Sequence, residues 1–207
     1  LGAFSLVGLK VSGPDIEDTL NSYMETANAA DLFVVAGYGL SGEDQAEIKQ
    51  ENADVEFGYF ADTVIGDTPN AIRVFSQTTD ISTFELVSGE FPTKSNEVAL
   101  SQTMADQYKI GDTIRLNESG SSTLLKEHEF TITGFVNSSE ILSKTIKGVS
   151  SAGSGDLSGF AVVPQDAFDS EVYTIARLLY PDLRIWKTTS RDYSDKVTEL
   201  QQALEEK

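Results

Sequence analysis

The sequence predicts an α+β fold, and three observations lead to that class. The chain has 207 residues, of which 40% are hydrophobic and 23% charged, so it is long enough and apolar enough to bury a core. Helical periodicity is clearest near the two ends, at residues 14–29 and 192–206. Between about residues 80 and 163 the apolar segments are short and turn residues are frequent, which indicates a β-rich region.

The N-terminal part is predicted to begin with an amphipathic helix at residues 14–29. Proline at its first position and acidic residues in its first turn suit the positive end of the helix dipole. A buried strand is expected at residues 31–36, ended by the glycines at positions 37 and 39. The apolar residues of the helix fall on one face, namely Ile16, Leu20, Tyr23, Met24 and Ala27.

A second, short helix is expected at residues 42–50, capped by Ser41 and lying on the surface because its apolar face is thin. Residues 55–61 alternate between apolar and polar or small residues, as a half-exposed strand does. After turn residues at 66–70, another strand is expected at residues 71–76. This order suits a layered α/β arrangement in which helices cover one sheet.

The middle of the chain is predicted to consist of short strands and turns. Two of the strands, 113–116 and 130–136, are expected to pair across the polar linker at residues 117–129. The loop at 136–159 is rich in Ser and Gly, and residues 150–155 are expected to be its most flexible part. The further elements expected here are a strand at 86–91 with a Gly break, a strand at 97–101 and about two helical turns at 102–108.

The C-terminal part is predicted to combine strands and helices again, as the N-terminal part does. A strand is expected at residues 160–163, a turn of helix at 164–168, a strand at 173–180 and a last helix at 192–206. Four residues of that helix form an apolar stripe, Tyr193, Val197, Leu200 and Leu204. The stripe predicts a core face; the alternative is a seam for a partner, if the helix continues beyond Lys207.

The charge balance excludes several classes of partner. The chain carries 33 acidic and 15 basic residues, a net charge of -18. Nucleic acid and anionic lipid would be repelled, because both bind through Lys and Arg. A cationic partner such as a basic peptide would be attracted. The alternative interpretation is that the charge only keeps the surface soluble.

The sequence offers no catalytic, cofactor-binding or metal-binding residues, and no enzyme activity is predicted. There is no Cys, so neither a disulfide, a thiolate nucleophile nor a Cys-ligated metal can form. His128 is the only histidine and is expected on an exposed strand edge. The sequence contains neither a nucleophile elbow nor a phosphate-binding loop.

Carboxylates are the one chemical group present in quantity. A hydrolase working through paired acids would use neighbours such as Asp54 with Glu56, or Asp62 with Asp67. In a chain this acidic such neighbours arise by chance and face solvent, so the hydrolase stays a rival without a preferred residue. No segment predicts a membrane span, since the longest apolar run is residues 32–36. The N-terminus lacks the pattern of a signal peptide, which leaves a cytosolic protein or a trimmed ectodomain.

One succession of motifs is more specific than composition. Together its pieces resemble the extracytoplasmic core domain of MacB-like and FtsX-like ABC-transporter permeases. The pieces are Leu86-x-x-Gly89-Glu-Phe-Pro92, Glu97-Val-Ala-Leu-Ser101, Tyr108-Lys-Ile-Gly-Asp-Thr-Ile-Arg-Leu116, Phe130-Thr-Ile-Thr-Gly-Phe-Val136 and Phe160-Ala-Val-Val-Pro164. The segments Ala30-Asp-Leu-Phe-Val34 and Gly39-Leu-Ser-x-x-Asp44 agree more loosely.

The resemblance implies a MacB-like periplasmic core fold of two parts. Residues 1–79 and 160–207 would form a porter-like α/β subdomain, and residues 80–159 an inserted β-rich, sabre-like subdomain. Both chain ends would face the membrane. Within the motifs, Gly111 is expected in a tight turn, and Gly134 where another backbone approaches or the strand bulges.

Two departures from the family pattern bear on the kind of bacterium from which the permease comes. Glu90 stands where the family often has Arg, and residues 149–158 do not resemble the long hairpin projections of tripartite efflux pumps. Docking to an outer-membrane tunnel is therefore not expected, and a Gram-positive permease exposed at the cell surface fits better.

The resemblance also implies a function. The domain would couple ATP-driven motion across the membrane to export or sensing of a peptide, antibiotic or lipoprotein, without catalysis. Its partners would be its own transmembrane helices, a cytoplasmic ABC ATPase subunit, a second permease in a dimer, and a peptide or extracellular protein. It would lie at the cell membrane, exposed on the extracellular side. The alternatives are a secreted or surface binding module without a transport role, and a permease-type regulator of a cell-wall hydrolase.

Overall fold

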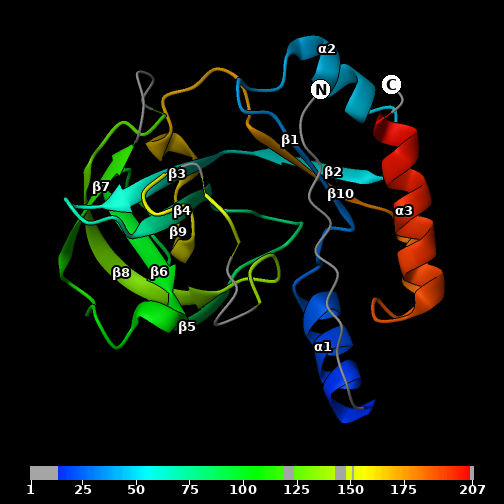
Figure 1. The fold of residues 1–207 in the computed structure, drawn as a ribbon, viewed down its shortest axis with the longest axis horizontal. Coiled ribbons are helices and arrows are strands. Elements are labelled where there is room, and N and C mark those ends of the chain that lie inside the picture. Colours follow the sequence, from blue (N-terminus) through cyan, green and yellow to red (C-terminus); the bar gives the residue numbers. More distant parts are fainter. Residues whose placement is uncertain (1–13, 119–123, 143–147, 151, 206–207) are drawn as a thin grey trace. The chain divides into compact units, whose positions relative to one another are not determined.

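The computed structural model describes residues 14–118, 124–142, 148–150 and 152–205. Both chain ends, part of the polar linker at 117–129, and residues 143–147 and 151 of the Ser- and Gly-rich loop therefore lie outside the described residues. Figure 1 labels the elements, which are α1 (Pro14–Thr26), β1 (Leu32–Val35), α2 (Gly42–Ile48), β2 (Asp54–Gly58), β3 (Phe60–Ile65), β4 (Ala71–Ser76), β5 (Glu85–Gly89), β6 (Glu97–Ser101), η1 (Gln102–Met104), β7 (Thr113–Glu118), β8 (Glu129–Asn137), β9 (Leu157–Val163), η2 (Gln165–Ala167), β10 (Ile175–Leu179), η3 (Pro181–Ile185) and α3 (Arg191–Glu205).

The described residues form two compact units, each with its own sheet, and the α+β class is confirmed with sheets of mixed strand direction. Unit 1 takes the described residues up to Phe57, the short segment Thr79–Thr83 and the residues from Val172 onward. Unit 2 takes Gly58–Thr78 and Phe84–Glu171.

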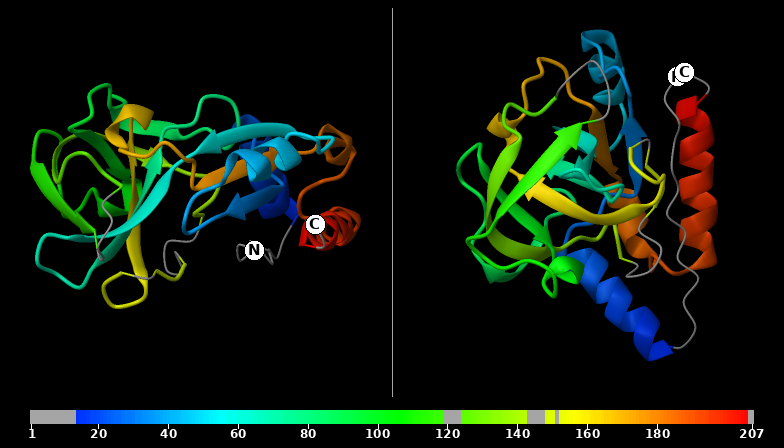
Figure 2. Two further views of the ribbon diagram at one scale, coloured as in Figure 1. Left: turned by 90° about the horizontal axis from the view of Figure 1, so that it is seen from above. Right: turned by 60° about the vertical axis from the view of Figure 1, so that its left-hand side comes forward.

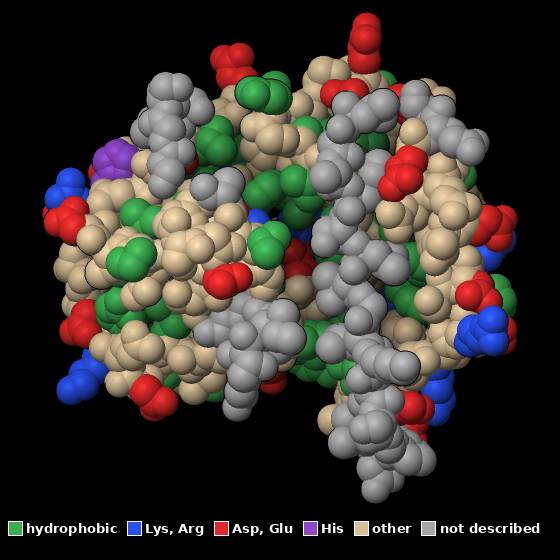
Figure 3. Space-filling model, in the orientation of Figure 1, with side chains coloured by type: hydrophobic (Ala, Val, Ile, Leu, Met, Phe, Trp, Pro, Cys, Tyr) green, Lys and Arg blue, Asp and Glu red, His purple; other side chains and the backbone are tan. Residues whose placement is uncertain are grey.

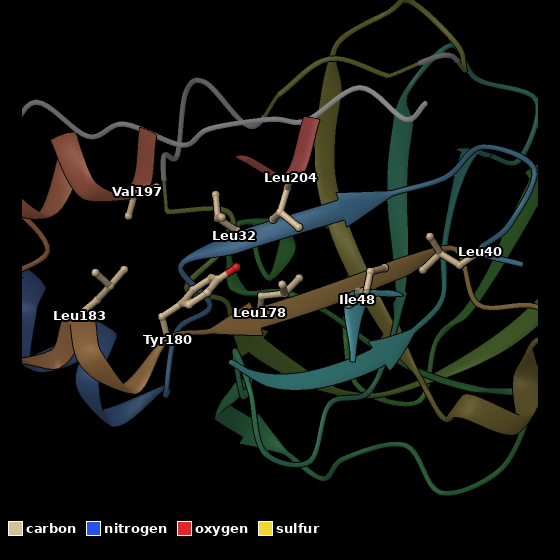
Figure 4. Packing of buried hydrophobic residues seen from close by; sticks show 9 residues of the cluster. Leu32, Leu40, Ile48, Leu178, Tyr180, Leu183, Val197 and Leu204 are labelled. Atoms are coloured by element: carbon tan, nitrogen blue, oxygen red, sulfur yellow. The ribbon is translucent and has the colours of Figure 1, made fainter. Parts of the chain in front are cut away.

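Unit 1 is built on a three-stranded sheet in the order β1-β10-β2. One face carries the hydrophobic core shown in Figure 4, where Leu32 of β1 lies opposite Leu178 of β10. Ile48 of α2 and Val197 and Leu204 of α3 pack into the same cluster, so both helices cover this face. The apolar stripe of α3 is therefore a core face, as predicted.

The other face of this sheet is covered by a short excursion of the chain, Thr79–Thr83. Ile81 packs there with Phe33 and Leu179. Glu56 holds the excursion in place, because its carboxylate accepts hydrogen bonds from the backbone N–H groups of Thr79 at 2.7 Å, Asp80 at 3.0 Å and Ile81 at 2.6 Å.

Helix α1 ends at Thr26, three residues before the predicted end. Asn28 follows with φ 49°, a left-handed conformation that a helix cannot continue through. Its side-chain amide donates to the carbonyl of Asp80 at 2.7 Å. Helix α2 has the predicted cap, since Ser41 and Asp44 form a reciprocal capping box.

Unit 2 is a seven-stranded sheet that closes on itself, and Figure 2 shows its strands curving round one another. The order is β5-β8-β6-β9-β4-β3-β7, and β7 pairs again with β8, as Thr113–Glu118 and Glu129–Asn137 were predicted to do. Six strands therefore form a closed barrel. The seventh, β5, pairs with the C-terminal half of β8.

The predicted single strand at 55–61 is wrong, because the chain passes from one unit to the other within it. Phe57, in β2, stacks on Tyr173 of unit 1 at a ring distance of 5.5 Å. Tyr59 stacks instead on Phe168 of unit 2 at 5.1 Å. The apolar residues alternate without a break across 55–61, but those before Gly58 pack in unit 1 and those after it pack in unit 2. The 3₁₀ helix η3 was not predicted.

Glycines 89 and 134 bring β5 and β8 unusually close. A Cβ atom at Gly134 would lie 2.6 Å from the carbonyl oxygen of Glu90 and 2.8 Å from that of Ser88. The pairing of β6 with β8 also shifts register next to Gly134. Both roles predicted for Gly134, close approach of backbone and a bulge, are confirmed.

The assignment of a porter-like and a sabre-like subdomain stays a prediction. The residues 58–78 and 160–171, predicted to belong with the chain ends, lie in unit 2. The reason is strand pairing, since β9 pairs in parallel with β4 and antiparallel with β6, which ties all three strands to the barrel.

Candidate functional site

Two of the four carboxylates considered for a hydrolase, Asp62 and Glu56, hold other parts of the chain in place. Asp62 of β3 accepts a bidentate ion pair from Arg73 of β4, at 2.6 and 2.9 Å. Glu56 is engaged with backbone N–H groups of Thr79–Thr83. Their neighbours Asp54 and Asp67 are exposed to solvent. One member of each pair is thus engaged by other groups of the protein, and the other member faces solvent.

The acidic side chains are dispersed. Figure 3 shows Asp and Glu spread over the visible face. Within the described ranges, there is no group of three or more His, Cys, Asp or Glu side chains that would hold a metal ion. His128 is exposed, as predicted, and one ring nitrogen lies 3.3 Å from the carbonyl oxygen of Leu116.

Unit 1 contains one buried carboxylate network. Asp31 accepts a hydrogen bond from the Tyr193 hydroxyl at 2.6 Å and another from the Tyr180 backbone N–H at 2.7 Å. Burial raises the pKa of Asp31, while these two hydrogen bonds and the charge of Arg184 oppose the rise. Burial and the negative Asp31 also raise the pKa of Tyr193, so its hydroxyl stays a donor. The network links the residue before β1, the residue after β10 and helix α3.

The most distinctive surface feature belongs to unit 2. Strand β5 is an edge strand, and all residues from Glu85 to Glu90 are exposed. The apolar side chains Leu86 and Val87 lie within it, 38% and 44% exposed. The register shifts between Leu86 and Ser88, so Val87 has no partner in the ladder with β8.

Ile110 adds to this apolar surface. It lies in the turn before β7 and is 50% exposed. Its side chain packs against Gly89. A Cβ atom added at Gly89 would lie only 2.7 Å from the Ile110 Cδ1 atom. We call Leu86, Val87 and Ile110 the β5 edge patch. Exposed apolar residues that group together mark interaction surfaces more often than isolated ones do.

The other strongly exposed apolar side chains lie on separate segments. Tyr38 follows β1, Val149 precedes β9, Val172 precedes β10, and Ile185 ends η3. The sequence named no site residue, and the β5 edge patch could not be found from it. Leu86 and Val87 look like any strand residues until the sheet order shows that β5 is at an edge.

The helices of the described segments are all too short or too polar to cross a membrane. In a comparison with protein families, residues 1–196 match the MacB-like periplasmic core domain. Among solved structures, the chain is similar to the extracellular domain of the noncanonic ABC-type transporter YknZ from Gram-positive bacteria, with 10% identity, a TM-score of 0.43, and coverage of 82% of this chain and 92% of that one. A comparison with curated proteins finds no match.

Proposed function

Because the chain belongs to the family of MacB-like periplasmic core domains, we propose that it is the extracellular domain of an ABC-transporter permease. The observation that carries the proposal is the extent of the family match, 196 of 207 residues. The domain acts without bond chemistry: it couples motion driven by a cytoplasmic ABC ATPase to export or sensing of a substrate. Peptides, antibiotics and lipoproteins are the substrate classes that the resemblance implies.

The order of the chain supports a role for unit 1 at the membrane. Unit 1 contains both the first and the last described helices, α1 and α3, whereas unit 2 is built from residues between them. In the proposal, unit 1 corresponds to the porter-like subdomain and joins the transmembrane helices of the permease, and unit 2 corresponds to the sabre-like subdomain. Two permeases form a dimer in the cell membrane.

Surface labelling in intact cells tests the side of the membrane on which the domain lies. The chain has no Cys, so an introduced Cys is the only thiol in this domain. Gln202 is exposed on α3, and Gln202→Cys in the full-length protein, kept free of other cysteines, should react with a membrane-impermeant maleimide before lysis. Labelling only after lysis would contradict the proposal.

Ala176→Cys provides the matched control. Ala176 is fully buried in β10 of the same unit, so its thiol should react only after denaturation. Labelling of Ala176→Cys in intact cells would show that the domain is unfolded, and the location would then be tested with a second exposed position, Gln107→Cys in unit 2.

A further inference from the structure

The β5 edge is the one open strand of the barrel that the described residues show. Each of the six strands of the closed ring pairs on both sides, whereas β5 pairs only with β8. A free strand edge presents unpaired backbone N–H and C=O groups and accepts another strand readily. The residues of β5 are all exposed, and among the described strands only β8 pairs with it.

The charges beside the apolar centre of β5 lie at its first residue, Glu85, and directly after its last residue, at Glu90. Glu85 and Glu90 flank the uncharged residues between them. Protected edges usually carry a charge or a proline in the centre of the strand. Here the centre is apolar, and the bulge at Val87 is the only protective device of that kind in the strand. An edge with an apolar centre and acidic ends suits an added strand with the opposite pattern.

A second copy of the chain fits this edge poorly. If two β5 strands paired antiparallel over residues 85–90, Glu85 of each copy would lie opposite Glu90 of the other. Like charges directly opposite across a strand pair are destabilising. The Glu85 side chain is moreover held in place, because its carboxylate accepts a hydrogen bond from the Asn137 side-chain amide at 2.9 Å.

The turn beside β5 contributes apolar surface without net charge. Ile110 is flanked by Lys109 and, after Gly111, by Asp112, whose carboxylate accepts from the Lys109 backbone N–H at 2.9 Å. The acidic ends of β5 therefore decide the charge preference at the strand, and Ile110 extends the surface that an apolar side chain of a partner would cover.

We propose that the β5 edge patch binds an extended peptide segment of another protein, which adds to unit 2 as a further strand. The segment has uncharged, partly apolar residues at its centre and Lys or Arg at both ends. Main-chain hydrogen bonds to β5 supply affinity, Leu86, Val87 and Ile110 contact its apolar side chains, and Glu85 and Glu90 select its basic ends. The inference rests on unit 2 alone and goes beyond the transport role.

A titration of the 207-residue chain with two blocked peptides tests the proposal. The probes are Lys-Val-Thr-Val-Thr-Lys and its counterpart with Glu at both ends, followed by NMR of the ¹⁵N-labelled protein. The Lys-flanked peptide should shift the amide signals of residues 85–90 and 134–137 and bind about tenfold more tightly than the Glu-flanked one. Its binding should weaken as salt is raised from about 0.05 to about 0.5 M.

Protein variants separate strand addition from unspecific attraction to an acidic surface. Val87→Lys places a charge in the centre of the edge and should weaken binding about tenfold. Val149→Lys is the matched control, because Val149 is also an exposed valine of unit 2 but lies outside the patch, and it should leave binding unchanged. The double variant Glu85→Lys and Glu90→Lys should reverse the preference between the peptides.

Three outcomes would overturn the proposal. The first is no shift at residues 85–90 with the Lys-flanked peptide. The second is equal weakening by Val87→Lys and Val149→Lys, which would show attraction to net charge alone. The third is a dimer in sedimentation that Val87→Lys dissociates, which would assign the edge to a second copy of the chain. A circular-dichroism spectrum identical to that of the unchanged protein establishes that each variant is folded.

Discussion

The two units hold their strands together in different ways. Unit 2 closes its sheet, so that six strands have partners on both sides and backbone hydrogen bonds carry much of its cohesion. Unit 1 has only three strands, drawn from distant parts of the chain, and two open edges. Its sheet depends on the helices that cover it and on side chains that hold backbone, such as Glu56 on residues 79–81 and Asp31 on Tyr180.

The difference indicates where substitutions act. In the barrel, positions at which backbones approach closely should be the sensitive ones, because a ladder has little room to move. In unit 1, the apolar core and the buried carboxylate should matter most. The contrast also explains why β5 is conspicuous, since it is the open edge attached to a ring that otherwise has none within the described part of the chain.

The largest effect should come from cavities in either core. Leu178→Ala in unit 1 and Leu100→Ala in unit 2 remove fully buried side chains and should each lower the free energy of unfolding by about 2–5 kcal/mol. Hydrogen exchange should locate the loss in β10 for the first variant and in β6 for the second. Leu86→Ala, at an exposed leucine, is the control and should have little effect. A loss below about 1 kcal/mol for either buried leucine would contradict the packing described.

The next largest loss of stability should come from a substitution at Gly134, where two backbones of the barrel approach closely. Gly134→Ala sets a Cβ atom against two carbonyl oxygens at 2.6 and 2.8 Å and should destabilise the protein by about 1–3 kcal/mol in urea denaturation. Gly42→Ala, where nothing lies within 4 Å of the added atom, should be neutral or slightly stabilising. Equal stability of the two variants would show that β5 and β8 are not in contact at Gly134.

The buried carboxylate of unit 1 should give an effect that depends on pH. Tyr193→Phe removes a donor to Asp31 and should destabilise by about 1–3 kcal/mol at neutral pH. The lost hydrogen bond lowers the pKa of Asp31, so without it the pKa rises further above its ordinary value. A raised carboxyl pKa reduces stability as pH rises through that pKa, and the deficit of Tyr193→Phe should therefore shrink as Asp31 becomes protonated in acid.

Tyr180→Phe is the control for that variant. Its hydroxyl lies 3.5 Å from Glu51, too far for a strong hydrogen bond, and its backbone N–H to Asp31 is retained. Thermal unfolding between about pH 3 and pH 7 should show a pH-independent and smaller loss for Tyr180→Phe. A pH-independent loss for Tyr193→Phe would mean that Asp31 is not coupled to it.

The smallest effect should come from a surface turn of unit 2. Hydrogen bonds from Lys94 and from the backbone N–H of Thr93 lower the pKa of Glu97 to about 2. A lowered carboxyl pKa stabilises the folded protein fully when the pH is above the ordinary pKa of the group. This stabilisation is lost as the pH falls through the lowered pKa of about 2. Glu97→Gln should thus be slightly less stable at pH 7 and approach the unchanged protein in strong acid. A deficit that grows in acid would contradict the assignment.

The sequence predicted the local elements well where one unit supplies all the partners. Helix α3, with its stripe from Tyr193 to Leu204, the cap at Ser41, and the pairing of β7 with β8 all followed from periodicity and turn chemistry. The family was also predicted from the order of short motifs, and the match over residues 1–196 confirms it. Three glycines of these motifs have a physical reason in the structure, since Gly89 and Gly111 have positive φ and Gly134 lies where the backbone of residues 88–90 approaches β8.

What the sequence could not predict depends on pairing between distant strands. The alternation across residues 55–61 does not reveal that β2 and β3 join different sheets. Closure of the barrel and the edge position of β5 depend on which strands meet, and no local pattern encodes that. The same holds for the roles of Glu56 and Asp62, which look like any surface acids until Thr79–Thr83 and Arg73 are placed beside them.

A distance measured in the assembled transporter tests most directly whether this domain moves with the ATPase. A spin label on Gln202→Cys in each permease of the proposed dimer reports the separation of the two domains by electron paramagnetic resonance. The distance distribution should differ between the nucleotide-free and the ATP-bound transporter. An ATPase subunit that cannot bind ATP should abolish the difference. Identical distributions in a transporter that hydrolyses ATP would contradict the claim that this domain moves with the ATPase cycle.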